Sequence, residues 1–296
     1  MNFTSELEKR TADVESGLCV YLPKETGFQS ELWEAMNYSL LSGGKRLRPI
    51  FMYETYRLFG GKKEALIRPF MAALEMIHTY SLVHDDLPAM DNDDYRRGRL
   101  TTHKKYGEDM GILAGDGLLN YAFETAAQAF LCKGEEQRAG QALAVLAKKA
   151  GGYGMIGGQV VDVKSCGQAI DKELLFFIHK HKTAALIEAA MMIGAILAGA
   201  DCNEVETVEK IAGNVGVAFQ IQDDILDVEG DEKLIGKPLH SDEKNEKTTY
   251  VTLVGIEKAK QEVEQYSEEA VCLLAGLKRQ SDFLESLIQA LIRREK

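Results

Sequence analysis

Apolar residues recur every three to four positions along most of the chain, which is the spacing of amphipathic α-helices. No long stretch alternates apolar and polar residues as a half-buried strand would. Glycine pairs at 43–44, 60–61, 151–152 and 157–158 interrupt the pattern, as glycines at helix ends do. The pattern predicts helices over residues 28–42, 47–59, 64–86, 107–131, 135–150, 171–200, 203–229, 250–276 and 280–294. We therefore expect an all-α protein.

Two of these helix starts carry capping signals. Asp171 can accept a hydrogen bond from the first turn that follows it, and Asn203 with Glu206 has the spacing of a capping box. No segment rich in proline and serine divides the 296 residues. We therefore expect a single domain that spans residues 1–296.

Charge and cysteine usage exclude several functions. The formal net charge of −11 disfavours a nucleic acid or an anionic membrane as the main partner. The five cysteines are odd in number and form no C-x-x-C pair, so neither a disulfide framework nor a zinc site is expected. The polar N-terminus lacks the apolar core of a secretory signal. The most apolar segment, residues 184–200, contains Glu188 and is short for a membrane span. We expect a core helix there, no membrane insertion and a soluble, cytoplasmic protein.

The candidate chemistry lies in two aspartate-rich motifs, HDDLPAMD at 84–91 and QDDILD at 222–227. Each follows a long helical pattern, so we expect two helices that present their acid clusters across one cavity. Pro88 should end the first helix near Asp86 and turn the chain back, which would bring Asp91 beside Asp85. In the second motif, Asp223 and Asp227 are four residues apart and share one helix face.

The same helix face carries Gln220, Gly216 and Gly213 below the second motif. Glycine is costly inside a helix, so this pattern predicts that another group approaches the backbone there. Clusters with oxygen ligands alone suit hard cations, and Mg²⁺ typically takes one or two carboxylates together with water and substrate phosphates. The motifs therefore predict Mg²⁺ with a diphosphate ligand.

Cationic segments accompany both acid motifs. They are SGGKRLRP at 42–49, RRGR at 96–99, HKHKT at 179–183 and the lysines at 233, 237, 244 and 247. Arginine binds phosphate oxygens bidentately, lysine binds them as a point charge, and Gly44 and Gly98 would let the backbone approach a ligand. His78 lies on the helix face that leads to Asp85, and Tyr80 with Ser81 lies about one turn below the acids.

With GGKRLRP upstream and Phe219-Gln220 before the second motif, DDLPAMD and DDILD closely resemble the motifs of trans-prenyltransferases of the isoprenoid synthase fold. The likeness runs from Gly44 to at least Lys247 and is greatest to bacterial farnesyl diphosphate synthases. It implies one large helical bundle around a central cavity, a homodimer and Mg²⁺, three ions in all. It also implies that isopentenyl diphosphate is condensed with dimethylallyl and then geranyl diphosphate.

The resemblance assigns residues to four roles. Those for the metal are Asp85, Asp91 and Asp223, supported by Asp86, Asp224 and Asp227. Those for isopentenyl diphosphate are Lys45, Arg48, His78 and Arg97, with Gly44 beside them. Those for the allylic substrate and its ionisation are Arg96, Lys182, Thr183, Gln220, Lys237 and Lys247. Those that limit product length are Tyr80 and Ser81, which point to a fifteen-carbon product.

Other functions remain open at this point. A longer-chain geranylgeranyl diphosphate synthase shares the same motifs. A non-catalytic subunit of a heteromeric synthase would be expected to have lost part of one, and neither motif is degraded here. A class I terpene cyclase would not need GGKRLRP or a second DDxxD, and a metal-dependent phosphohydrolase would need a second His-Asp pair.

Overall fold

The computed structural model describes residues 2–229 and 248–292, which form two compact units. The first unit comprises Met1–Tyr53 and Lys62–Leu143, and the second comprises Glu54–Gly61 and Ala144–Lys296. Each unit is described by itself. The predicted single domain therefore stays a prediction.

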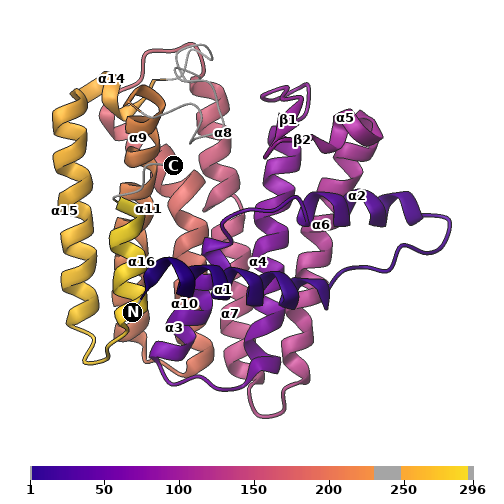
Figure 1. Cartoon of the computed structure of the whole chain (residues 1–296), viewed down its shortest axis with the longest axis horizontal. Coiled ribbons are helices and arrows are strands. Elements are labelled where there is room, and N and C mark those ends of the chain that lie inside the picture. Colours follow the sequence, from indigo (N-terminus) through magenta and orange to yellow (C-terminus); the bar gives the residue numbers. More distant parts are fainter. Residues whose placement is uncertain (1, 230–247, 293–296) are drawn as a thin grey trace. The chain divides into compact units, whose positions relative to one another are not determined.

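The first unit is built around two helices that lie alongside each other, α4 (Glu64–Asp85) and α6 (Glu108–Ala127) (Figure 1). Around them lie α1 (Phe3–Cys19), α2 (Ser30–Leu40), α5 (Thr102–Tyr106) and the 3₁₀ turn η1 (Gln128–Leu131). Gly115 allows the close packing of α4 on α6, because a Cβ there would overlap the His84 ring. Helices α3 (Leu47–Leu58) and α7 (Glu136–Ala150) each begin in this unit and end in the second.

A short β-hairpin follows α4 in the first unit. Its strands, β1 (Tyr95–Arg96) and β2 (Arg99–Leu100), pair antiparallel. The two residues between them, Arg97 and Gly98, have φ of 53° and 74°, and two positive φ angles are what a type I′ turn requires. RRGR is thus a tight turn as well as a cationic segment.

The second unit contains α8 (Met155–Ser165), α9 (Lys172–Ile178), α10 (Ala185–Ala198), α11 (Cys202–Glu229), α14 (Tyr250–Val254), α15 (Ile256–Ala275) and α16 (Asp282–Ile292). Helix α11 packs against α10 and α15. Between α9 and α10 the chain forms a π-helix, η2 (His179–Ala184). A π-turn in a longer helix is rare and is frequently found at a functional site.

Two glycines bring their helices against this π-helix. A Cβ at Gly158 of α8 would overlap the backbone of Lys182, and a Cβ at Gly216 of α11 would overlap Ala184. The predicted approach to the backbone at Gly216 is therefore confirmed, and the group that approaches is η2 itself.

The all-α prediction is confirmed, and every predicted range coincides with helix over most of its length. Helices α1, α5 and α8 were not predicted, and the range 250–276 is broken at Gly255, where φ is 82°. Asp171 caps α9 as predicted, accepting from the Leu174 N–H. The capping box at Asn203 is wrong, because the reciprocal hydrogen bonds join Asp201 and Glu204.

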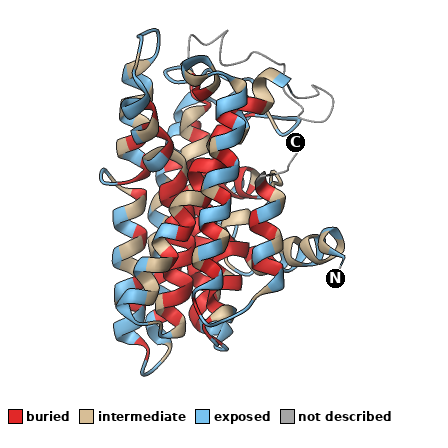
Figure 2. Ribbon diagram, turned by 90° about the vertical axis from the view of Figure 1, so that its left-hand side faces the viewer, coloured by how far each residue is buried: buried red, intermediate tan, exposed pale blue. Residues whose placement is uncertain are grey.

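Most residues of α10 are buried. Figure 2 colours the buried residues of the chain red and the exposed residues pale blue. By length and composition, Lys172–Ala198 could cross a membrane, but 72% of its most apolar window is buried in the structure. The expected core helix in this segment is therefore confirmed.

Candidate active site

In the first unit, Pro88 produces the predicted turn. Helix α4 ends at Asp85, and three residues after Pro88 the Asp91 N–H donates to the Asp85 carbonyl oxygen at 2.9 Å. Asp85 is half-buried, whereas Asp91 is exposed. The turn therefore brings Asp91 back to the end of the helix while its carboxylate stays accessible.

A cationic cluster lies beside this turn. Arg48 Nη1 is 3.4 Å from His78 Nε2, and the Arg97 guanidinium donates to the Gly43 carbonyl oxygen. A Cβ at Gly44, where φ is 137°, would be 2.8 Å from Arg97 Nη1. The cluster thus gathers Arg48, His78, Arg97 and Gly44 from the predicted isopentenyl diphosphate set, with Lys45 exposed next to them in sequence.

The electrostatics of this cluster favour an anion. Burial holds the pKa of His78 well below its usual value, and the charges of Arg48 and Arg97 lower this pKa further. His78 is therefore a neutral hydrogen-bonding group near pH 7. Burial also lowers the pKa of Arg48, and the positive charge of Arg97 acts in the same direction. A bound diphosphate would compensate these positive charges.

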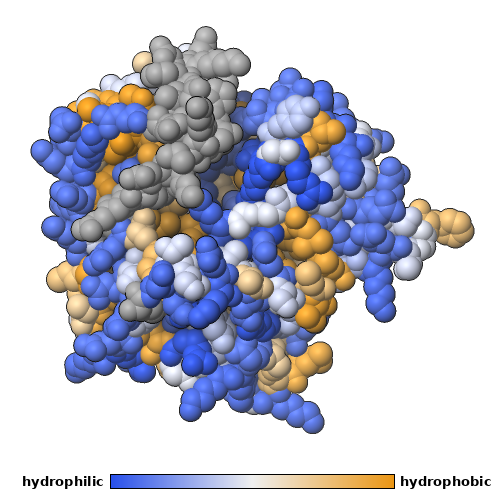
Figure 3. All heavy atoms as spheres, viewed as in Figure 1, coloured by the Kyte–Doolittle hydropathy of each residue, from blue (hydrophilic) through white to orange (hydrophobic). Residues whose placement is uncertain are grey.

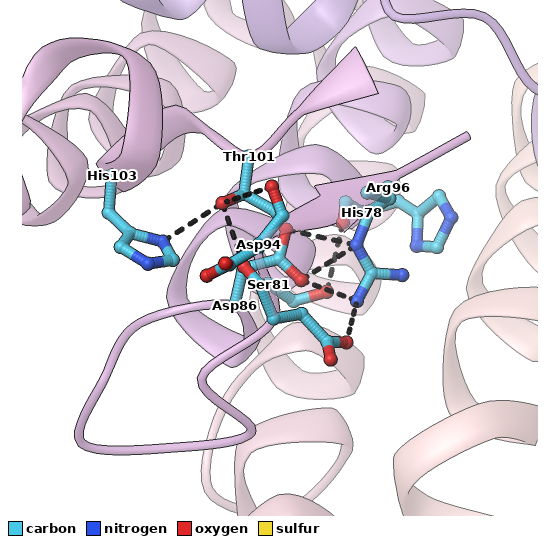
Figure 4. Close-up of polar contacts among 8 residues, drawn as sticks. His78, Ser81, Asp86, Asp94, Arg96, Thr101 and His103 are labelled. Carbon is cyan, nitrogen blue, oxygen red and sulfur yellow. Dashed lines mark hydrogen bonds and ion pairs between the residues drawn. The ribbon is translucent and has the colours of Figure 1, made fainter. Parts of the chain in front are cut away.

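Asp86 is turned inward and holds the hairpin. Its carboxylate accepts from Arg96 Nε at 2.8 and 3.0 Å and from Arg96 Nη2 at 2.6 Å, and only 3% of the residue is exposed (Figure 4). Burial alone would lower the pKa of Arg96, but the hydrogen bonds and charge of Asp86 raise it above its usual value. This ion pair places Arg96 directly behind the first motif.

The base of the hairpin is fixed by buried hydroxyl groups. The Thr101 hydroxyl donates to the Asp93 carbonyl oxygen at 2.8 Å and is 3.1 Å from His103 Nδ1 (Figure 4). Thr102 Oγ1 is 2.7 Å from Ser39 Oγ of α2. The outer surface around the hairpin is mostly hydrophilic (Figure 3), consistent with a site for charged ligands.

Arg46, the central cation of GGKRLRP, plays a structural part that the sequence did not reveal. Its side chain is 1% exposed, and it donates to Glu75 Oε1 at 2.7 Å and to the Leu40 carbonyl oxygen at 2.8 Å. Arg46 also has a positive φ of 49°. The buried ion pair therefore fixes the segment from which Lys45 and Arg48 project.

Tyr80 and Ser81 lie one turn before the motif, on α4. Tyr80 is 5% exposed, and its ring meets the His84 ring edge-on with centroids 5.8 Å apart. Burial, assisted by the charge of Asp85, raises the pKa of Tyr80 to about 12. The Ser81 hydroxyl donates to the His78 carbonyl oxygen at 2.9 Å.

The second unit carries the other half of the predicted set. Lys182 Nζ is 2.5 Å from Asp162 Oδ2, and the Thr183 hydroxyl donates to Gln220 Oε1 at 2.8 Å. Lys182, Thr183 and Gln220 line one pocket. The other residues that line it are Asp162, Leu175, Ile178, His179, Asp224, Thr248 and Thr249.

The three aspartates of the second motif differ in exposure. Asp223 is exposed and Asp227 is half-buried, whereas Asp224 is 4% exposed. His179 Nε2 lies 3.7 Å from Asp224 Oδ2, and burial lowers the pKa of His179 to about 4. Lys237 and Lys247 lie outside the described residues.

The donor set fits Mg²⁺. Within residues 2–229 and 248–292, no group of three or more His, Cys, Asp or Glu side chains could hold a metal ion by itself. Mg²⁺ does not require such a cage, because it commonly binds through one or two carboxylates and completes its shell with water and substrate phosphates. The accessible carboxylates Asp85, Asp91, Asp223 and Asp227 are ligands of that kind.

Residues 29–284 match the family model described as polyprenyl synthetase. The chain belongs to the polyprenyl synthetase family. It is 43% identical to a farnesyl diphosphate synthase of Geobacillus stearothermophilus, over 89% of this chain and 88% of the relative. It is 48% identical to a chloroplastic geranylgeranyl pyrophosphate synthase of Capsicum annuum, over 82% of this chain and 66% of the relative.

Solved structures agree with this membership of the polyprenyl synthetase family. A geranyltransferase of Helicobacter pylori, complexed with magnesium and isoprenyl diphosphate, superposes with a TM-score of 0.85 at 32% identity. The match covers 99% of this chain and 97% of the other. The isoprenoid synthase fold expected from the motifs is thereby confirmed.

Proposed function

We propose that this chain is a Mg²⁺-dependent trans-prenyltransferase that makes farnesyl diphosphate from isopentenyl diphosphate and the allylic diphosphates dimethylallyl and geranyl diphosphate. The observation that carries the proposal is the cationic cluster of Arg48, His78 and Arg97 beside the accessible carboxylates Asp85 and Asp91. The cations can bind the oxygens of a diphosphate directly, and the carboxylates can bind Mg²⁺ that is coordinated by a diphosphate.

In this proposal the homoallylic substrate binds on the cationic cluster. Arg48 and Arg97 contact its diphosphate, and neutral His78 donates or accepts a hydrogen bond there. Lys45, whose side chain is exposed, adds a positive charge next to Gly44. The positive φ of Gly44 and the absence of a Cβ leave room for the Arg97 guanidinium.

For the allylic substrate, the resemblance to trans-prenyltransferases implies Mg²⁺ ions and a second set of cations as its binding groups. Asp85, Asp91 and Asp223, with Asp227, would hold three Mg²⁺ ions, which when bound act as Lewis acids on the leaving diphosphate. Asp86 and Asp224 would support the site through their contacts within the protein, with Arg96 and with the Tyr250 N–H. Arg96 and Lys182, with Lys237 and Lys247 beyond the described residues, would contact the same diphosphate.

As the allylic C–O bond breaks, positive charge develops on the allylic carbon. The oxygens of Thr183 and Gln220, already joined by a 2.8 Å hydrogen bond, are preorganised dipoles for that charge. The double bond of isopentenyl diphosphate then attacks the cation, and a proton is lost to the departing diphosphate. This chemistry needs no protein nucleophile.

The test is release of diphosphate from geranyl diphosphate by purified protein with Mg²⁺. We expect rapid release only when isopentenyl diphosphate is added, with farnesyl diphosphate as product. Release without the second substrate would instead indicate a cyclase or hydrolase. No release under any condition would indicate a non-catalytic subunit.

Product length is expected to depend on Tyr80. Replacing it with Ala removes a buried phenol one turn before Asp85, so the growing chain should extend beyond fifteen carbons. Product analysis by mass spectrometry after incubation with excess isopentenyl diphosphate measures this effect. Tyr80→Phe is the matched control, because it keeps the ring that meets His84 and removes only the hydroxyl group. An unchanged product from Tyr80→Ala would remove Tyr80 from this role.

The proposed enzyme acts in the cytoplasm as a homodimer. The resemblance to trans-prenyltransferases supports both statements, and the farnesyl diphosphate synthase relative is bacterial.

A further inference from the structure

The middle aspartate of the second motif is more buried than the other two. Asp224 is 4% exposed, whereas Asp223, the preceding residue, is exposed. In a helix, adjacent residues point about 100° apart, so the two carboxylates point in different directions. The first motif is divided in the same way, since Asp86 is 3% exposed and engaged with Arg96.

The partners of Asp224 come from three segments. Oδ2 accepts the main-chain N–H of Tyr250 at 2.7 Å, and Oδ1 accepts from Gln220 Nε2 at 3.3 Å. His179 Nε2 lies 3.7 Å from Oδ2. One buried carboxylate therefore joins α11 to the start of α14, with His179 of the π-helix close to it.

The hydrogen bond to Tyr250 joins Asp224 to the residue most distant from it in sequence among its hydrogen-bond partners named above. Tyr250 is the first residue of α14, and Thr249 caps that helix by accepting from the Thr252 N–H. Thr248 and Thr249 line the same pocket as Lys182, Thr183 and Gln220. Asp224 therefore fixes one wall of this pocket.

We propose that Asp224 is a positioning residue, which holds the Thr248–Tyr250 wall against α11 by accepting the Tyr250 N–H and thereby shapes the pocket for the allylic diphosphate. The statement that this pocket takes the allylic diphosphate rests on the proposed function. The statement that Asp224 positions the Thr248–Tyr250 wall does not, because it concerns the protein without ligands.

Two substitutions separate this role from metal ligation. Asp224→Asn keeps a side-chain oxygen for the Tyr250 N–H and removes the charge, whereas Asp224→Ala removes both. Amide hydrogen exchange of the full-length protein, without substrate or metal, measures directly how well the main-chain N–H groups of the Thr248–Tyr250 wall are protected. We expect exchange at Tyr250 and in α14 to rise about tenfold in the Ala variant and to change little in the Asn variant, since a hydrogen bond to a charged group is worth about that factor.

Kinetics give the second readout. The KM for geranyl diphosphate should rise about tenfold in Asp224→Ala, with substantial rescue in Asp224→Asn, while the Mg²⁺ concentration for half-maximal rate stays within about twofold of the original in both. Asp223→Asn is the matched variant at the adjacent carboxylate, and it should raise that Mg²⁺ concentration clearly.

Either of two results would overturn the proposal. One is unchanged exchange at Tyr250 in the Ala variant. The other is a Mg²⁺ requirement in Asp224→Asn that rises as far as in Asp223→Asn, a comparison that stands even if Asp224→Ala does not fold. An inactive parent protein with the expected exchange pattern would count against the proposed function alone.

Discussion

Asp85→Asn is expected to lower kcat/KM by about 10²- to 10³-fold, the loss typical when one preorganised electrostatic group is removed from a site of charge development. The substitution preserves the shape of the side chain. It also preserves the hydrogen bond between the Asp91 N–H and the Asp85 carbonyl oxygen, because that bond is made by main-chain atoms. The loss should therefore come from the missing negative charge. Steady-state kinetics at several Mg²⁺ concentrations measure it, and higher Mg²⁺ should restore part of the rate.

Asp94→Asn is the matched control for this prediction. Asp94 lies in the same acidic stretch, but its carboxylate pairs with Lys104 at 2.9 Å and is about half exposed. Exposed pairs of this kind contribute little to stability, so the control should fold and keep its activity. Equal losses in the two variants would indicate that overall negative charge matters, and would contradict a specific metal-binding role for Asp85.

Glu75→Leu is expected to lower the free energy of unfolding by about 3–5 kcal/mol, because it leaves the buried Arg46 guanidinium without its ion-pair partner. The two side chains are 1% and 3% exposed. Arg46 would keep its hydrogen bond to the Leu40 carbonyl oxygen and a 3.6 Å approach to the more exposed Glu15, neither of which replaces a buried carboxylate. Urea denaturation followed by circular dichroism measures the change.

An exposed ion pair provides the comparison. Lys9 and Glu6 are 70% and 30% exposed, and Lys9→Met should change the free energy of unfolding by less than about 1 kcal/mol. If Glu75→Leu were as mild as this control, the Arg46–Glu75 pair would not stabilise the GGKRLRP segment.

The sequence alone predicted those features that depend on neighbouring residues. The helical period located most helices, and Pro88 predicted the turn that returns Asp91 to Asp85. The family motifs then assigned the site. Helix α8 was missed because its sequence, with glycines at 157 and 158, carries little amphipathic pattern and is surrounded by glycines that signal helix ends.

The remaining features depend on contacts between residues distant in sequence. The sequence does not distinguish Arg46 from the other cations of GGKRLRP, because its partner Glu75 is 29 residues away. Nor does it distinguish Asp224 from the other aspartates of its motif, because the N–H that this carboxylate accepts belongs to Tyr250, 26 residues later. The π-helix has no signature of its own, although close glycines such as Gly158 and Gly216 indicate that something approaches the backbone there. The Arg97-Gly98 pair was a usable hairpin signal that we interpreted only as charge.

The π-helix at His179–Ala184 has a consequence for how this region can change during evolution. A π-turn contains about one residue more than the α-turn it replaces, so deleting one residue there would convert it to an ordinary α-turn. The residues on one side of the deletion would then rotate by about 100° and shift by about 1.5 Å relative to those on the other. After a deletion ahead of Thr183, Thr183 could not stay opposite Gln220 while Lys172, at the start of α9, stayed opposite Glu262. Amino-acid replacements in this segment are therefore easier to accommodate than a change in its length.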